Sequence, residues 1–180
     1  VFAHIDDVEQ VIKNIKKILD KDGVFVTESH YLISLLKTVQ YDTIYHEHMR
    51  YYSLSSLNYL FSKFNLNIFF VKKIPTHGGS IRVYVTNNRN QKKHSSVENI
   101  LKYEKKFLNH KSFNLFKKKV VLSKIKLYSL LKNLKSQNKK IFGVGAPSRA
   151  ATLINYVGLN EDIIKYILEI KGSYKIGKYM

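Results

Sequence analysis

The sequence contains no cysteine and no tryptophan, and only two of its 180 residues are proline. Without cysteine, these residues form neither a disulfide nor a thiolate metal site. A run of about 18 apolar residues, the length that spans a membrane, is also missing. No charged and then apolar leader opens the sequence. We therefore expect a cytoplasmic protein with no membrane partner.

Acidic residues are scarce as well, with 13 Asp and Glu against 31 Lys and Arg and a formal net charge of +18 at pH 7. Such an excess would suggest a nucleic-acid partner. Almost all of it is lysine spread along the chain, however, and no zinc-finger, ribonucleoprotein or clear helix-turn-helix motif accompanies it. A phosphate-bearing small substrate fits the arginines equally well. We expect no nucleic-acid partner, although charge alone leaves that alternative open.

The first half of the chain alternates helical and strand patterns. Apolar residues at three- and four-residue spacing predict a helix capped by Asp6 and a second helix capped by Ser55. Strands are predicted at 24–27, 68–71 and 81–86, and the stretch before the first helix reads as a strand end or the loop after one. A short turn separates the last two strands, so they must pair antiparallel.

This order is typical of the second half of a class I, Rossmann-like methyltransferase sheet, in which parallel strands are closed by an antiparallel last strand. We therefore predict an α/β fold, with residues 1–90 as the C-terminal half of a methyltransferase domain. The polar stretch 87–93 marks a boundary. Beyond it, a capping box at Ser95 and Glu98 and a helix start at Ser112 open long helices. Residues 91–180 then form a smaller, Rossmann-like C-terminal domain.

The C-terminal part contains a strand, a glycine turn and a helix at 141–156, followed by a strand at 164–170. A helix N-terminus approached by glycines is a ready anion site, since free N–H groups and the positive dipole end face the ligand. The candidate phosphate ligands are Gly143, Gly145, Ser148 and Arg149. The alternative is a tight turn without a ligand, because Pro147 and Ser148 replace the third glycine of the usual motif.

Tyr45, His46, Glu47 and His48 put a phenol, two imidazoles and a carboxylate at consecutive positions, which favours proton-transfer chemistry. In an extended loop, Tyr45 and Glu47 would share one face and the histidines the other. A polar surface loop with a chance pair of histidines is one alternative. A metal held by both imidazoles is another, but it needs a third ligand that the sequence does not place. We expect no metal site in these residues.

Several stretches together resemble the S-adenosylmethionine-dependent sugar C-methyltransferases, which methylate a carbon of nucleotide-linked deoxysugars. They are Phe-Ala-His-Ile around His4, Thr-Ile-Tyr-His-Glu-His at 43–48, and Thr-His-Gly-Gly-Ser-x-Arg at 76–82. The tail from Gly143 onward is similar to the C-terminal domain of that family. The resemblance covers nearly all of the chain, in order.

The resemblance implies roles for individual residues. His48 would remove the proton alpha to the keto group of the sugar, with Tyr45 and Glu47 positioning the imidazole and the substrate. His4 would lie at the edge of the cofactor and donate a hydrogen bond to the keto oxygen or enolate. The substrate ligands would include the four candidate phosphate ligands of the glycine turn together with His77, Ser80, Arg82 and Asn155.

In that family a zinc-bearing N-terminal domain and a glycine-rich cofactor loop come first, and neither is found in these residues. The remaining cofactor site and the zinc are therefore expected before Val1, and we expect this chain alone to be inactive and monomeric. Arg149 stands where the family often has lysine, and Ala151 where it often has asparagine. An O- or N-methyltransferase and a non-catalytic nucleotide-sugar binding protein remain the alternatives.

Overall fold

The structure is a computed structural model that describes residues 2–178. Contacts between residues divide the chain into two compact units. Unit 1 comprises residues 1–38 and 47–114, and unit 2 comprises residues 39–46 and 115–180. The segment from Tyr45 to His48 therefore belongs partly to each unit. The domain boundary predicted after residue 90 stays a prediction, since compact units and folding domains need not coincide.

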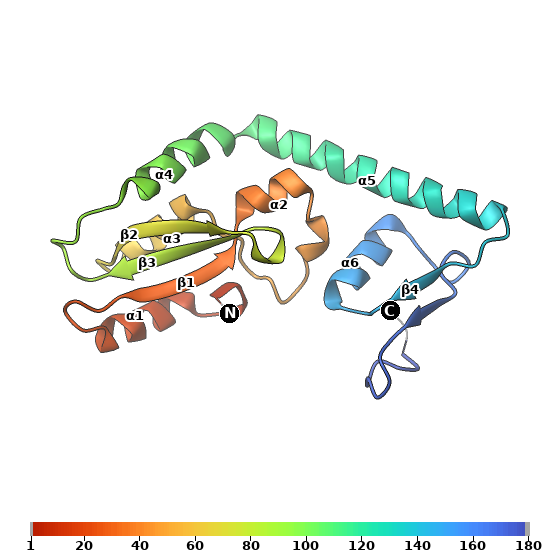
Figure 1. The fold of residues 1–180 in the computed structure, drawn as a ribbon, viewed down its shortest axis with the longest axis horizontal. Coiled ribbons are helices and arrows are strands. Elements are labelled where there is room, and N and C mark those ends of the chain that lie inside the picture. Colours follow the sequence, from red (N-terminus) through yellow and green to blue (C-terminus); the bar gives the residue numbers. More distant parts are fainter. Residues whose placement is uncertain (1, 179–180) are drawn as a thin grey trace. The chain divides into compact units, whose positions relative to one another are not determined.

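Unit 1 is built on a three-stranded sheet of β1 (Phe25–His30), β2 (Asn67–Ile74) and β3 (Ser80–Thr86). The strand order is β1-β3-β2, and β3 runs antiparallel to both neighbours (Figure 1). The predicted antiparallel pairing of the last two strands is confirmed. Because β3 is antiparallel to both, β1 and β2 run in the same direction without touching.

Apolar and more polar side chains alternate along β3, so the sheet of unit 1 has one apolar face. Ile81, Val83 and Val85 are fully buried, whereas Arg82 and Tyr84 between them are half-buried on the other face. The apolar face packs against α1 (Val8–Ile18), α3 (Leu54–Ser62) and the start of α4 (Ser95–Phe107). The helix α2 (Leu32–Thr38) follows β1. One continuous core therefore fixes the N-terminal segment and the loop that precedes α3.

The chain start agrees with the second predicted alternative, a loop. Residues Phe2–His4 form a short 3-10 helix, η1, and not a strand end. Phe2 is buried, with its ring about 6 Å from the rings of Phe25, Tyr52 and Phe61. Burial of this side chain turns the backbone into the core. Apolar content alone did not reveal that turn.

The helices begin one or two residues away from the predicted starts. In each case a nearby polar side chain, and not the predicted cap, accepts the N–H of the first helical turn. The observed caps are Asp7 in place of Asp6, Ser53 in place of Ser55, and His94 in place of Ser95. The long helix α5 (His110–Ser136) likewise starts before Ser112, whose N–H donates to the Asn109 side chain. The choice among adjacent polar residues depends on which apolar side chains become buried, and that is a tertiary effect.

Unit 2 contains the rest of α5, a short helix η2 (Tyr41–Thr43), and β4 (Phe142–Val144), α6 (Ser148–Val157) and β5 (Tyr166–Leu168). The strands β4 and β5 are parallel, with Gly143 opposite Ile167. The predicted order of strand, turn, helix and strand is confirmed, and β5 is shorter than the predicted 164–170. Val157, Leu159 and Ile163 form a small core with half-buried residues of α5 and α6.

Candidate active site

Two residues predicted to be catalytic from distant stretches of the sequence meet in unit 1. The imidazole rings of His4 and His48 lie 4.9 Å apart, centroid to centroid, at an interplanar angle of 59°. His48 also faces the ring of Tyr51 edge-on, at 6.3 Å. His4 is exposed and His48 is half-buried, so both rings are accessible to a small molecule. The arrangement places the two imidazole rings side by side.

Backbone contacts hold the two histidine segments together. The N–H of Met49 donates to the carbonyl of Ala3 at 3.2 Å. The guanidinium of Arg50 donates to the carbonyls of Ile5 and Asp6, the latter at 2.7 Å. Arg50 therefore has a positioning role that the sequence did not predict. The sequence signal that could have predicted this role is the position of Arg50, two residues after the proposed base His48.

Tyr45 and His46 line a different feature, a hollow of about 390 Å³ in unit 2. The other lining residues belong to α6: Ser148, Ala151, Thr152 and Asn155. The hollow thus joins Tyr45, a predicted catalytic residue, with Ser148 and Asn155, both predicted to bind substrate. His46 was predicted only as part of the proton-transfer segment, and no substrate contact was predicted for Ala151 or Thr152. Helical periodicity could have found the latter two, since positions 148, 151, 152 and 155 share one helix face.

The Tyr-His-Glu-His segment does not form the extended loop that was assumed. The backbone turns at His46 and Glu47, so Tyr45 and His46 line the same hollow and do not face opposite ways. Glu47 is exposed and belongs to unit 1 with His48. Its predicted role in positioning the base stays a prediction.

Arg149 lies at the start of α6, as predicted, and forms an ion pair. Its Nη2 is 2.7 Å and its Nε 2.9 Å from Oδ2 of Asp42. The rings of Tyr41 and Tyr156 lie 5.1 Å apart and join η2 to α6 as well. A guanidinium has five donors, so this pair leaves donors for a phosphate oxygen. Asp42 is a further residue that the sequence did not single out.

The glycine turn uses its backbone donors inside the protein. Gly145, at φ +78°, donates its N–H to the carbonyl of Leu168 at 2.8 Å. Ala146 donates to Oε2 of Glu169 at 3.1 Å. A Cβ on Gly143 would lie 3.0 Å from Cγ1 of Ile167, so this glycine permits close strand packing. The N–H of Gly145 is therefore already bonded to β5, and the predicted phosphate role of the turn and the α6 start stays a prediction.

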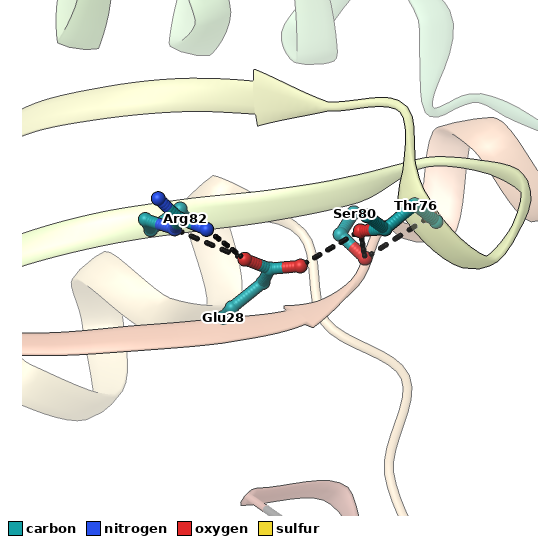
Figure 2. A network of polar contacts seen from close by, with 4 residues as sticks. All are labelled: Glu28, Thr76, Ser80 and Arg82. Atoms are coloured by element: carbon teal, nitrogen blue, oxygen red, sulfur yellow. Dashed lines mark hydrogen bonds and ion pairs between the residues drawn. The ribbon is translucent and has the colours of Figure 1, made fainter.

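Two of the three predicted ligands from 76–82, Ser80 and Arg82, lie on β3 in a polar network with Glu28 and Thr76 (Figure 2). Arg82 donates from Nε and Nη2 to Oε2 of Glu28, at 3.0 and 2.8 Å, and Thr76 donates to Oε1 at 2.8 Å. Ser80 is buried, and its hydroxyl is 3.4 Å from that of Thr76. His77 is exposed in the turn η3 (Thr76–Gly78), with φ of 52°. Cross-strand pairing of Glu28 with Arg82 was the signal that could have predicted this network.

The Glu28 network predicts a pH-dependent contribution to stability. Hydrogen bonds from Arg82 and Thr76 hold the pKa of the Glu28 carboxyl below its ordinary value of 4.5. A lowered pKa in the folded state gives stability that is present above the unfolded pKa and is lost as the pH falls through the folded pKa. Glu28→Gln should therefore lower the urea midpoint modestly near neutral pH, with the difference from wild type shrinking as the pH falls below 4.5.

A matched control for this experiment is Glu161→Gln, which changes an exposed glutamate that lies outside the helices and strands. Its midpoint should follow that of the wild type over the same pH range. A difference between wild type and Glu28→Gln that stays constant from neutral pH down to about pH 3 would contradict the assignment, because titration of the carboxylate must remove it.

Among the described residues, 2–178, no helix is long and apolar enough to cross a membrane. No group of three His, Cys, Asp or Glu side chains in this range is placed to hold a metal ion.

Comparison with known proteins agrees with the resemblance read from the sequence. A family model described as the C-methyltransferase C-terminal domain matches residues 75–180, and one described as a methyltransferase domain matches residues 1–69. The chain is 31% identical over 171 residues to C-methyltransferase NovU of Streptomyces niveus. That alignment covers 92% of this chain and 40% of NovU. The predicted family is confirmed: the chain belongs to the C-methyltransferases.

Proposed function

We propose that the protein transfers a methyl group from S-adenosylmethionine to a carbon alpha to a ketone in a nucleotide-linked deoxysugar, with His48 as the base. The observation that carries this proposal is the His4–His48 pair, whose rings lie 4.9 Å apart. Membership in the C-methyltransferase family supports the reaction type. The identity of NovU as a C-methyltransferase supports it further.

The chemistry explains why two imidazoles are needed. A carbon next to a ketone is weakly acidic, so methylation requires a base for its proton and a donor for the enolate oxygen. The acidic carbon and the keto oxygen are separated by one carbon atom, and two adjacent imidazoles can reach both. His48 removes the proton, a step in which a positioned base contributes about a hundred- to ten-thousand-fold. His4 donates to the developing oxyanion, an interaction worth about a hundred- to a thousand-fold.

S-adenosylmethionine, when bound, supplies an electrophilic methyl group. We assign the edge of its site to His4, which is exposed and whose ring lies 4.9 Å from that of His48. The methyl group of the cofactor and the acidic carbon of the sugar would then meet at the His4–His48 pair.

For the substrate we propose the hollow lined by Tyr45 and α6. Ser148 and Asn155 offer a hydroxyl and an amide to a sugar ring, and Tyr45 offers a flat aromatic surface and a phenol. Arg149, ion-paired with Asp42, is our candidate for a phosphate contact. Glu47, His77, Ser80 and Arg82 keep their proposed roles as further positioning or substrate residues.

The reaction is tested by following the transferred carbon. The full-length protein, given ¹³C-methyl S-adenosylmethionine and a nucleotide-linked keto-deoxysugar, should yield a product whose labelled methyl couples to the carbon next to the ketone in the NMR spectrum. The same sugar with its ketone reduced to an alcohol should not react, because its carbon is no longer acidic. A label found on oxygen or nitrogen would support the O- or N-methyltransferase, and binding without any transfer would support the non-catalytic protein.

A further inference from the structure

We infer that the glycine turn of unit 2 binds sugar hydroxyl groups through Glu169, and not the phosphates of the nucleotide. The inference rests on the proposed nucleotide-sugar substrate and names the part of it that this turn recognises. Neither the sequence motifs nor the family comparison assigns a role to Glu169, which follows β5 directly.

The turn leaves no backbone donor for a phosphate between positions 145 and 147. The N–H of Gly145 donates to Leu168, the N–H of Ala146 donates to Glu169, and Pro147 has no N–H. A phosphate at this point would have to displace a strand contact or a carboxylate. The turn therefore carries its own anion.

The carboxylate of Glu169 is held firmly. Oε2 accepts from Ala146 at 3.1 Å, and Oε1 accepts from the N–H of Ile170, also at 3.1 Å. These two bonds hold the pKa of the Glu169 carboxyl below its ordinary value, so the group stays ionised. Lys175 donates to the carbonyl of Ala146 at 2.7 Å and lies 3.8 Å from Oε2. The carboxylate thus takes the N–H groups that a phosphate would need at this point.

An ionised carboxylate accepts hydrogen bonds and donates none, so the ligands that suit Glu169 carry hydroxyl groups. The side chain keeps 16% of its surface exposed and can be reached from solvent. Strand β4, the turn, α6 and β5 also follow the order of a dinucleotide-binding unit, where an acidic residue about 20 positions after the glycines binds ribose hydroxyls. Ser148, just beyond the turn, lines the hollow proposed for the substrate. Glu169 bonds Ala146, two residues before Ser148, and this short separation along the chain is our ground for assigning both residues to one sugar-bearing ligand.

Two sugars could supply these hydroxyls, the pentose of the nucleotide or the transferred hexose. Three probes separate them: uridine diphosphate, 2′-deoxyuridine diphosphate, which lacks one pentose hydroxyl, and uridine diphosphate glucose. Calorimetric titration of the full-length protein should compare wild type, Glu169→Gln and the control Glu161→Gln, an exposed glutamate of the same unit. Inorganic pyrophosphate serves as a probe of a bare phosphate site.

We expect Glu169→Gln to lower the affinity for a hydroxyl-bearing probe about tenfold or more. The affinity for pyrophosphate should not rise above that of the wild type. If the variant binds uridine diphosphate more weakly but binds its deoxy analogue as the wild type does, the hydroxyl is that of the pentose. If only the affinity for the glucose conjugate falls, the hydroxyl is that of the hexose. Tighter binding of pyrophosphate or of the nucleotides would overturn the inference, because the carboxylate would then be blocking a phosphate site. Unchanged affinities, or no binding of any probe to wild type, would overturn it too. None of these outcomes depends on methyl transfer, so they leave the proposed reaction to its own test.

Discussion

Replacing His48 by alanine should lower turnover by about a hundredfold or more while substrate affinity changes little, because a general base acts mainly in the transition state. The His48 ring is half-buried between His4 and Tyr51. Truncation of this ring removes the proton acceptor but leaves the backbone contacts of Met49 and Arg50 that hold the segment. A loss of kcat with a nearly constant KM is therefore the expected signature.

The measurement pairs turnover with exchange of the acidic proton. Wild-type protein should exchange the substrate's alpha hydrogen with deuterated solvent, and the His48→Ala variant should not. His110→Ala is a suitable control, since His110 is an exposed histidine at the start of α5 and is in neither candidate site. If exchange persists in the His48 variant, the role of base passes to His46 or Glu47.

Local sequence signals predicted the elements that depend on near neighbours. The short turn at 75–79 forced β2 and β3 to pair antiparallel, and the glycine turn before Ser148 placed the start of α6 correctly. Hydrophobic periodicity is a local property and survives in the fold. The exact caps were missed where two candidates stood close together, as with Ser53 and Ser55, because tertiary burial chooses between them.

The sequence indicated which side chains belong to the candidate site more fully than it indicated which of them lie close together. It placed His4 and His48 in one reaction, and their rings lie 4.9 Å apart. It could not show that the backbone turns after Tyr45, or that Asp42 pairs with Arg149 across a long sequence separation. Ion pairs between distant segments depend on the fold as a whole. For the same reason, the sequence gave no sign that Glu104, a charged residue within α4, is buried.

Glu104 is 1% exposed in α4. Its carboxylate accepts from the backbone N–H of Leu54 at 2.6 Å and of Ser55 at 2.7 Å, and from the Ser55 hydroxyl. Leu54 and Ser55 form the first turn of α3, where N–H groups lack partners within the helix and a negative charge is favoured. One side chain of α4 thus satisfies the start of α3, the helix that follows the His48 loop.

Glu104→Ala should lower the free energy of unfolding by about 3 kcal/mol or more, since it leaves buried donors on α3 unpaired and removes hydrogen bonds to a charged group. Urea denaturation followed by circular dichroism measures the change. Glu104→Gln should fall between wild type and alanine, because an amide keeps one acceptor oxygen.

Two further variants keep this prediction testable. Lys102→Ala, at an exposed position of the same helix, should change stability by no more than about 0.5 kcal/mol. Ser55→Ala removes one donor and leaves the backbone bonds to Glu104, so it should cost about 1 kcal/mol even if the alanine variant at 104 fails to fold. Equal stabilities of Glu104→Ala and Lys102→Ala would show that the α3–α4 contact does not depend on this carboxylate.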